Sequence, residues 1–429
     1  MTNLPTTDLL RLATAGSVDD GKSTLVGRLL YDTKSVLADQ LDAVHRASAD
    51  RGSSGPDLSL LVDGLRAERE QGITIDVAYR YFATPHRSFV LADTPGHVQY
   101  TRNTVTGAST AHLAILLVDA RTGVVQQARR HAAVLALLGA PRLVLAINKI
   151  DLVDYDEPTY RRITEEFTEY VTTLGYSPGD VLAIPVSALH GDNVVELSEH
   201  TPWYRGPTLL RHLETVSAGT GADDGPSRLA VQYVIRPRPE DHPDYRGYAG
   251  QLVGGTLSVG DAVTVWPAGH DTTISGIDTP NGPVTEVGSG RSVTLLLADD
   301  LDISRGDLLA RTDQPPTVTD TVDATVCWLA DTPLRPGTQV LVKHGTRTVR
   351  GLVEALCARF DEQHLTSDPD ARELGLNDIG RIKLRTSEPL PVDDYSTSRA
   401  TGAFLVIHPS DGGTLAAGLI GTTLPTGDS

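Results

Sequence analysis

The sequence predicts an α/β domain with a mostly parallel sheet and helices on both faces, followed by two β-barrel domains. Two observations support this fold class. In the first half of the 429 residues, short apolar runs are followed by segments with helical spacing, as in parallel α/β sheets. Beyond a Gly-rich stretch at 217–227, short alternating strands with turn residues replace the helical periodicity, which is typical of small barrels. We therefore expect domains at 1–216, 228–314 and 315–429, joined by a linker at 217–227.

A glycine-rich loop separates the first predicted strand, at 10–15, from the first predicted helix, at 24–31. It matches the P-loop pattern, in which glycines let backbone N–H groups turn inward around phosphates. In this pattern the Lys22 ammonium reaches the terminal phosphates and the Ser23 hydroxyl ligates Mg²⁺. A Gly-rich turn that only caps a helix is the alternative, and the flanking strand and helix favour the P-loop. The expected phosphate-binding residues are Gly16, Ser17, Val18, Asp19, Asp20, Gly21, Lys22, Ser23 and Thr24.

A second motif follows the strand predicted at 88–92. It consists of Asp93, Thr94, Pro95, Gly96 and His97. In P-loop enzymes an aspartate at this place holds the Mg²⁺ shell through water, and the Gly96 N–H is placed to bond the γ-phosphate. We therefore expect the site to sense whether the γ-phosphate is present.

Four residues are candidates for catalysis of phosphate cleavage: Lys22, Thr74, Gly96 and His97. His97 is expected to position water for in-line attack, a role that Gln has in some P-loop enzymes; a purely structural histidine is the alternative. Thr74 is the candidate switch residue, because its hydroxyl and carbonyl could ligate Mg²⁺ and the γ-phosphate and let go after hydrolysis. The predicted metal ligands are thus Ser23, Thr74 and Asp93.

A third motif indicates which base is bound. Asn148, Lys149 and Asp151 follow an apolar run at 143–147, which should place them at the carboxyl end of a buried parallel strand. A carboxylate at Asp151 can accept hydrogen bonds from guanine N1–H and its exocyclic amine, whereas adenine N1 offers a lone pair. Mismatches of this kind discriminate by about 10⁴ to 10⁵. The sequence therefore predicts GTP and not ATP.

A loop that supports the guanine through a backbone N–H is predicted after the strand at 181–186. It contains Ser187, Ala188 and Leu189. This tripeptide has no meaning alone, but here it is the last member of an ordered set of nucleotide-binding motifs. The complete set predicts a P-loop GTPase with GTP and Mg²⁺ as its cofactors.

Composition indicates which partners and which cellular location to expect. A net charge of −18 argues against a large nucleic-acid footprint, which depends on basic patches. No apolar run has the length of a membrane span, and the N-terminus lacks a signal pattern. Cys327 and Cys357 form no metal motif and no disulfide framework, so we expect buried thiols in a cytoplasmic protein. Neither nucleic acid nor a membrane is expected as a partner.

A P-loop domain followed by two β-barrels resembles the translation-factor class of GTPases over essentially the whole chain. Within that class the motifs are most similar to the large, GTP-hydrolysing subunits of bacterial ATP sulfurylase. Elongation factors typically have His where this chain has Asp20, and Cys or Ala where it has Thr94. The segments that carry the resemblance are 16–34, 63–75, 93–103, 203–208 and 245–250.

This resemblance implies a heterodimer. A small adenylyltransferase subunit would convert ATP and sulfate to adenosine 5′-phosphosulfate and pyrophosphate, while this chain hydrolyses GTP. The competing hypothesis is an elongation factor that delivers aminoacyl-tRNA, which would share the entire GTPase site but needs a basic face on the barrels. With only Lys343 and Lys383 beyond the linker, arginines would have to build that face. A third hypothesis is a GTP-binding regulator with negligible turnover.

Overall fold

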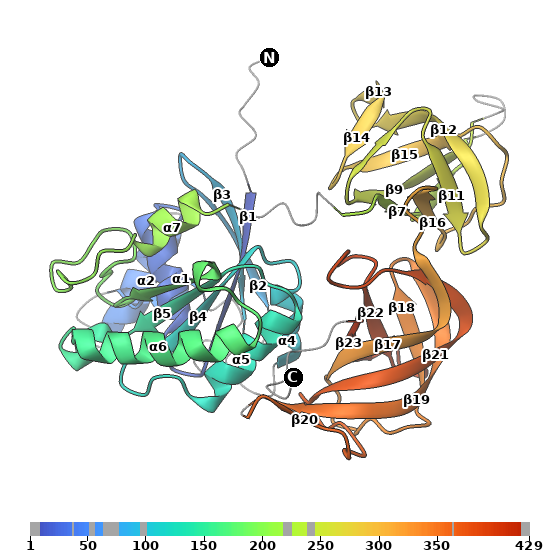
Figure 1. Ribbon diagram of the computed structural model, residues 1–429. Helices are drawn as coiled ribbons and strands as arrows, with labels where there is room; N and C mark the ends of the chain where they lie inside the picture. Colours follow the sequence, from blue (N-terminus) through green and yellow to red (C-terminus); the bar gives the residue numbers. More distant parts are fainter. Residues whose placement is uncertain are drawn as a thin grey trace. The chain divides into compact units, whose positions relative to one another are not determined.

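The computed structural model contains an α/β domain followed by two β-barrels (Figure 1). The structure describes residues 9–36, 38–50, 56–62, 77–94, 101–217, 225–237, 245–362 and 364–421. The chain divides into two compact units, formed mainly by residues 1–219 and 220–423. The α/β domain makes up the first unit and both barrels belong to the second.

The α/β domain is built on a six-stranded sheet. Its strands are β1 (Leu9–Gly16), β2 (Ala78–Ala83), β3 (Ser88–Asp93), β4 (Leu113–Asp119), β5 (Leu143–Asn148) and β6 (Val181–Pro185). They are ordered β2-β3-β1-β4-β5-β6, with β2 antiparallel to β3 and all other neighbours parallel. Every residue of β4 and β5 is buried, as expected for parallel strands that are covered on both faces.

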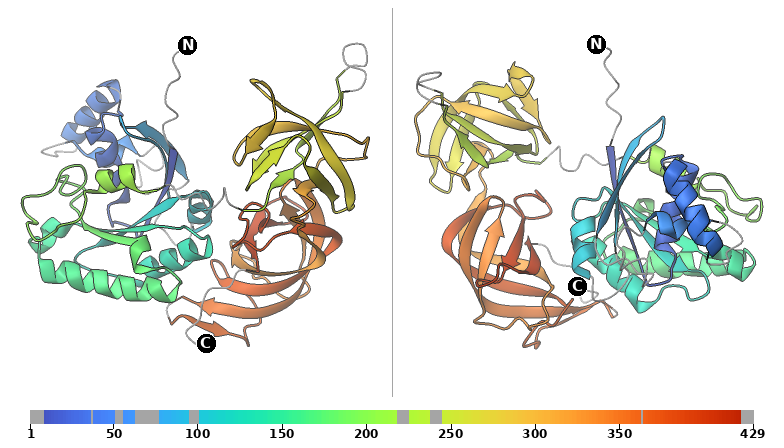
Figure 2. Two further views of the ribbon diagram at one scale, coloured as in Figure 1. Left: turned by 45° about the horizontal axis from the view of Figure 1, so that its top comes forward. Right: turned by 180° about the vertical axis from the view of Figure 1, so that it is seen from behind.

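Helices cover both faces of this sheet, as predicted (Figures 1 and 2). The α-helices are α1 (Lys22–Asp32), α2 (Ala38–Asp50), α4 (Thr101–Ala108), α5 (Gln126–Leu137), α6 (Glu157–Thr173) and α7 (Leu209–Thr215), and the 3₁₀ turns are η1 (Leu58–Leu61), η3 (Ile150–Val153) and η4 (Pro178–Asp180). Leu25 of α1 and Leu209 of α7 share a core with Leu10 of β1 on one face. Helices α4, α5 and α6 pack against the sheet and each other on the opposite face.

The first barrel closes with six strands. Its elements are β7 (Arg228–Ala230), β8 (Tyr233–Ile235), β9 (Gly247–Val253), β10 (Thr256–Ser258), β11 (Ala262–Trp266), β12 (His270–Thr279), β13 (Gly282–Val284), β14 (Glu286–Gly288), β15 (Ser292–Leu297) and β16 (Leu308–Arg311). The order β11-β16-β7-β9-β15-β12 becomes a ring because β12 also pairs with β11. Tyr248, Leu252 and Leu295 are among the side chains that fill its core.

The second barrel closes in the same way. Its strands are β17 (Thr317–Trp328), β18 (Gln339–His344), β19 (Arg347–Asp361), β20 (Thr366–Asp368), β21 (Ile379–Val392), β22 (Ala403–Ile407) and β23 (Thr414–Ile420). The order β18-β22-β23-β17-β21-β19 becomes a ring through the pairing of β18 with β19. Trp328, Val353 and Phe404 lie in its core. The predicted fold class is therefore confirmed.

Several details differ from the sequence-based expectations. From the sequence we expect a single strand at 250–257, but the structure has two, β9 and β10, because Gly254 and Gly255 turn the chain with φ of 67° and 49°. We did not predict β12, which contains two aspartates and a glycine, or β23, which contains alanine and glycine; aspartate, glycine and alanine have low strand propensity. Cys327 is buried, but Cys357 is exposed, so the expectation of two buried thiols was wrong for the second.

Candidate nucleotide-binding site

The phosphate loop connects the end of β1 to the start of α1. Gly21 has a φ of 91°, and a Cβ atom there would lie 2.4 Å from Asn148 Nδ2, so only glycine fits. Lys22 is 7% exposed, and its Nζ donates hydrogen bonds to the carbonyl oxygens of Gly16 (2.9 Å) and Ser17 (2.7 Å). The ammonium thus lies across the loop whose N–H groups are expected to bind phosphate.

Burial and the nearby negative charges shift the pKa of Lys22 in opposite directions. Burial is the larger effect and holds the pKa of its ammonium below the ordinary value, while the carboxylates of Asp93, Asp20 and Asp19 raise it in part. The surrounding carboxylates therefore favour the charged form that phosphate binding requires.

Asp20 places a carboxylate inside the phosphate loop. It is 6% exposed, and its Oδ2 accepts a hydrogen bond of 2.6 Å from the Ser17 backbone N–H. Burial raises the pKa of Asp20, and the Ser17 hydrogen bond and the Lys22 charge lower it. The side chain of Asp20 braces the loop from within, and its contact with the nucleotide stays a prediction.

Asp93 lies at the end of β3 and is fully buried. Its Oδ1 accepts a hydrogen bond of 2.8 Å from Thr14 Oγ1. The parallel pairing of Ala13 with Ala92 brings Thr14 beside Asp93, and the Thr94 hydroxyl donates back to the Thr14 carbonyl oxygen. The sequence analysis did not identify Thr14, although a polar residue within an apolar strand is a signal that could have done so.

Asn148 joins the phosphate loop to the predicted guanine loop. Its Nδ2 donates to the Asp20 carbonyl oxygen at 2.6 Å, and its Oδ1 accepts the Ala188 N–H at 2.9 Å. Next to it, Lys149 Nζ donates to the Asp19 carbonyl oxygen. The structure thus brings together the ends of β1, β5 and β6, at the edge of the sheet where α/β proteins bind their ligands.

Asp119, the last residue of β4, was missed by the sequence analysis. Its Oδ2 lies 3.0 Å from Lys149 Nζ and 2.6 Å from Arg121 Nη2. Burial alone would raise the pKa of Asp119, but the hydrogen bonds from Arg121 and Lys149 hold it well below its usual range. An aspartate directly after an apolar run was the available signal, as it was for Asp93.

Asp151 lies in η3 with its side chain 13% exposed, and His190 Nε2 is 3.8 Å from its Oδ2. Ser187 and Ala188 are buried, whereas Leu189 is 61% exposed. The base-recognition residues of the predicted set therefore lie along one edge of the sheet.

Four predicted site residues, Thr74, Pro95, Gly96 and His97, lie outside the described residues. Their roles in catalysis and metal binding stay predictions.

The residues of the phosphate end fit a magnesium ion. Ser23 supplies a hydroxyl and Asp93 a carboxylate, the hard oxygen ligands that Mg²⁺ prefers together with phosphate oxygens. The Oγ atom of Ser17 is buried and has no hydrogen-bond partner within the described part of the chain. In the same residues no group of three or more His, Cys, Asp or Glu side chains forms a metal cluster.

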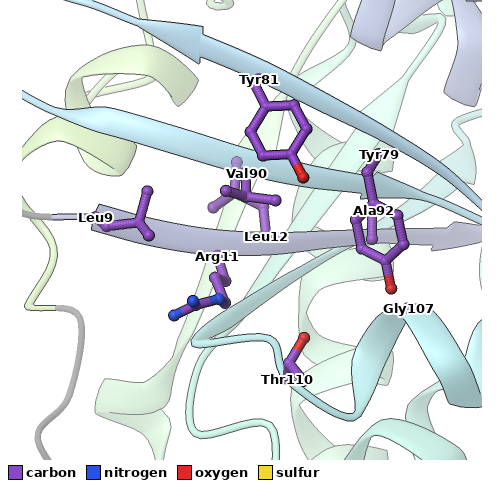
Figure 3. A pocket seen from close by; sticks show the side chains of 9 residues that line it. All are labelled: Leu9, Arg11, Leu12, Tyr79, Tyr81, Val90, Ala92, Gly107 and Thr110. Atoms are coloured by element: carbon purple, nitrogen blue, oxygen red, sulfur yellow. The ribbon is translucent and has the colours of Figure 1, made fainter. Parts of the chain in front are cut away.

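A hollow of about 320 Å³ lies elsewhere on the sheet, over the strands β1, β2 and β3 (Figure 3). Tyr79 and Tyr81 project from β2 on the same side as Arg11 of β1, and Tyr81 is 74% exposed. None of its lining residues belongs to a nucleotide motif.

Among the helices that the structure describes, none has the length and apolar character needed to cross a membrane.

Two family models match this chain. Residues 7–213 match the elongation factor Tu GTP binding domain, and residues 321–421 match the GTP-eEF1A C-terminal domain-like family. A solved structure of sup35 complexed with GMPPNP aligns with 98% of this chain and 95% of its own, at 22% identity and a TM-score of 0.42.

Curated relatives are much more similar. The "Bifunctional enzyme CysN/CysC" of Mycobacterium tuberculosis is 55% identical over 96% of this chain and 67% of its own length. "Sulfate adenylyltransferase subunit 1" of Salmonella typhi is 49% identical over 96% of this chain and 85% of its own length. The chain therefore belongs to the sulfate adenylyltransferase subunit 1 family, with a GTP-binding domain of the elongation factor Tu type.

Proposed function

We propose that this chain is the GTPase subunit of a heterodimeric ATP sulfurylase, which couples GTP hydrolysis to the synthesis of adenosine 5′-phosphosulfate from ATP and sulfate. The observation that carries the proposal is the 49% identity to a sulfate adenylyltransferase subunit 1 over 96% of the chain. The buried contacts among the P-loop, Asp93 and Asn148 support nucleotide binding by this domain.

At the phosphate end, Lys22 binds the terminal phosphates, and Ser23, Asp93 and Thr74 hold Mg²⁺. When bound, Mg²⁺ would neutralise charge that develops on the phosphate oxygens. The Gly96 N–H senses the γ-phosphate, and His97 positions the attacking water.

At the base end, Asp151 accepts hydrogen bonds from guanine, and the backbone of the 187–189 segment supports the base. Asn148 and Lys149 fix the base loop to the phosphate loop through the contacts described above. We thus assign guanine selectivity to Asp151. We assign the rigidity of the site to Asn148 and Lys149.

Coupling needs a partner that responds to the nucleotide. A phosphosulfate anhydride is high in energy, so its formation needs another reaction to drive it. GTP cleavage can do so only if the two nucleotide states differ in their contacts with the partner. We assign this switching to the segments around Thr74 and Gly96, and adenylyl transfer itself to a small adenylyltransferase subunit. Because the name of the Salmonella relative contains "subunit 1", it supports the existence of a second subunit.

We further propose domains at 1–216, 228–314 and 315–429 with a linker at 217–227, and a cytoplasmic location. Delivery of aminoacyl-tRNA is disfavoured. One curated relative above is named as a sulfate adenylyltransferase subunit and the other as a CysN/CysC enzyme, and neither is named as a translation factor.

The test is pyrophosphate release from ATP and sulfate by the purified small subunit, with and without this chain. We expect strong stimulation that requires both this chain and hydrolysable GTP, and little with a non-hydrolysable analogue. An absence of stimulation, with GTP hydrolysis responding instead to ribosomes and aminoacyl-tRNA, would transfer the assignment to translation.

A further inference from the structure

Arg28 connects the helix of the phosphate site to the predicted guanine loop. It lies on α1, and its Nε donates a hydrogen bond to the Ala188 carbonyl oxygen at 3.3 Å. Its Nη2 donates to the next carbonyl oxygen, that of Leu189. One guanidinium group thus binds two successive carbonyl groups of the loop.

The guanidinium is held in place by its own helix. Nη1 lies 3.5 Å from Asp32 Oδ1, Cζ lies 5.9 Å from the centroid of the Tyr31 ring, and the side chain is only 18% exposed. A planar fork with a fixed orientation can hold two carbonyl groups at once, which a lysine ammonium on a flexible stem does poorly. The contact is therefore specific to arginine.

The predicted guanine loop at 187–189 is held from two sides. The Ala188 N–H donates to Asn148 Oδ1 of β5, and the Ala188 carbonyl oxygen accepts from Arg28 of α1. The same helix begins with Lys22 and carries Ser23, the proposed ligands of phosphate and Mg²⁺. A single rigid element thus sets the positions of the phosphate residues and of the base loop.

We propose that Arg28 is a positioning residue for guanine recognition. It holds the 187–189 segment so that the backbone N–H of Leu189 meets the guanine O6 atom, since the N–H groups of Ser187 and Ala188 already donate to Asp192 and Asn148. Arg28 itself does not contact the nucleotide. This inference rests on the proposed function, because it assumes that the nucleotide is GTP and that this loop faces the base.

The experiment is a binding cycle between protein variants and modified nucleotides. The full-length chain and Arg28→Met are titrated with GTP, 6-thio-GTP and ITP. Sulfur in place of O6 is a weaker acceptor, so the 6-thio penalty reports the loop contact, whereas ITP lacks the 2-amino group and reports Asp151. We expect Arg28→Met to weaken GTP binding about tenfold, the effect of one lost hydrogen bond of about 1.4 kcal/mol, and to abolish the 6-thio penalty. The ITP penalty should persist.

Two further variants complete the cycle. Arg28→Lys keeps the charge but loses the fork, and we expect it to lose the 6-thio penalty as well; it replaces Arg28→Met if that variant does not fold. Arg46→Met removes an exposed arginine of α2, whose Nε donates to the Asp42 carbonyl oxygen, and should leave all three affinities unchanged.

Retention of the 6-thio penalty in both Arg28 variants, with all three nucleotides weakened equally or not at all, would overturn the positioning role. A wild-type chain that binds ATP as well as GTP would instead overturn the proposed GTP site, and this inference with it.

Discussion

We propose that Asp151 determines the base through the match between its carboxylate and two guanine donors. Asp151→Asn removes one acceptor and adds a donor, so guanine loses its complement and xanthine, with a carbonyl at C2, gains one. We expect GTP affinity to fall at least about tenfold and the preference to move towards XTP, because polar mismatches in a buried site are costly. Competition binding with GTP and XTP measures this.

A matched control for Asp151→Asn lies three residues further along the chain. Asp154 is exposed and has a φ of 54°, a conformation that asparagine also accepts, so Asp154→Asn should leave both affinities unchanged. Unaltered guanine selectivity in Asp151→Asn would refute the assignment of Asp151.

His131 makes the stability of the GTPase domain depend on pH. It is 2% exposed on α5, and burial, followed by the charges of Lys22 and Arg130, lowers its pKa to about 3. The unfolded chain has the ordinary histidine pKa of about 6.5, so between pH 6.5 and 3 it binds a proton that the folded domain does not. This contribution to stability is complete above pH 6.5 and is lost as pH falls, by about 2 kcal/mol at pH 5.

We therefore expect His131→Gln to have a shallower loss of stability between pH 7 and pH 5 than the wild-type chain. The free energy of opening from amide hydrogen exchange in β1 and β4 measures the difference, because both strands lie in the core of this domain. His45→Gln, which changes an exposed histidine of α2, should behave like the wild type. Equal slopes for His131→Gln and the wild type would contradict the account.

The phosphate loop depends on the left-handed turn at Gly21. Gly21→Ala would strain the backbone by about 1–2 kcal/mol. It would also press a Cβ atom against Asn148 Nδ2, which donates to the Asp20 carbonyl oxygen of the phosphate loop. We expect GTP affinity to fall at least about tenfold, as measured by equilibrium titration. Gly175→Ala is the control, because Gly175 has a similar φ of 98° but no atom within 4 Å of a Cβ.

Gly175→Ala should lower the stability of the domain and leave its GTP affinity unchanged. If the two variants bound GTP equally well, the close approach of Asn148 to the loop would have no importance for nucleotide binding.

Which elements could be predicted from sequence depends on how local their signals are. The strands at β3, β5 and β6 and the start of α1 were predicted because apolar runs and loop residues are contiguous there. The contacts of Thr14 with Asp93, of Asp119 with Lys149 and of Arg28 with Ala188 could not be predicted, because these partners lie far apart in sequence and meet only through the fold. The roles of Asp20 and Asn148 as braces also required the tertiary contacts.

A buried ion pair joins the two barrels. Arg228 of β7 donates through Nε and Nη2 to Asp393, which follows β21, at 2.9 and 2.8 Å. Their side chains are 2% and 9% exposed. Loss of one partner leaves a buried charge without its complement, which typically costs about 3–5 kcal/mol. We expect Asp393→Asn to destabilise the unit that contains both barrels by this amount, measured by denaturant unfolding of the full chain.

An exposed pair of the same geometry serves as the control. Arg381 donates to Asp323 at 2.8 and 2.7 Å, but the two side chains are 49% and 52% exposed. Asp323→Asn should cost less than about 1 kcal/mol. A cost for Asp393→Asn as small as that for Asp323→Asn would show that the buried pair is not essential to the barrel unit.

We propose that GTP hydrolysis drives sulfate activation and does not merely accelerate it. An allosteric activator speeds the approach to equilibrium, whereas an energetic coupling moves the end point. The most direct measurement is the amount of adenosine 5′-phosphosulfate at the end of the reaction, formed by the complex of this chain with the small subunit. Reactions with GTP and with a non-hydrolysable analogue are compared at the same ATP and sulfate concentrations. We predict that GTP raises the final amount well above the uncoupled equilibrium and that phosphate from GTP accumulates alongside it. The same final amount with both nucleotides would contradict the account.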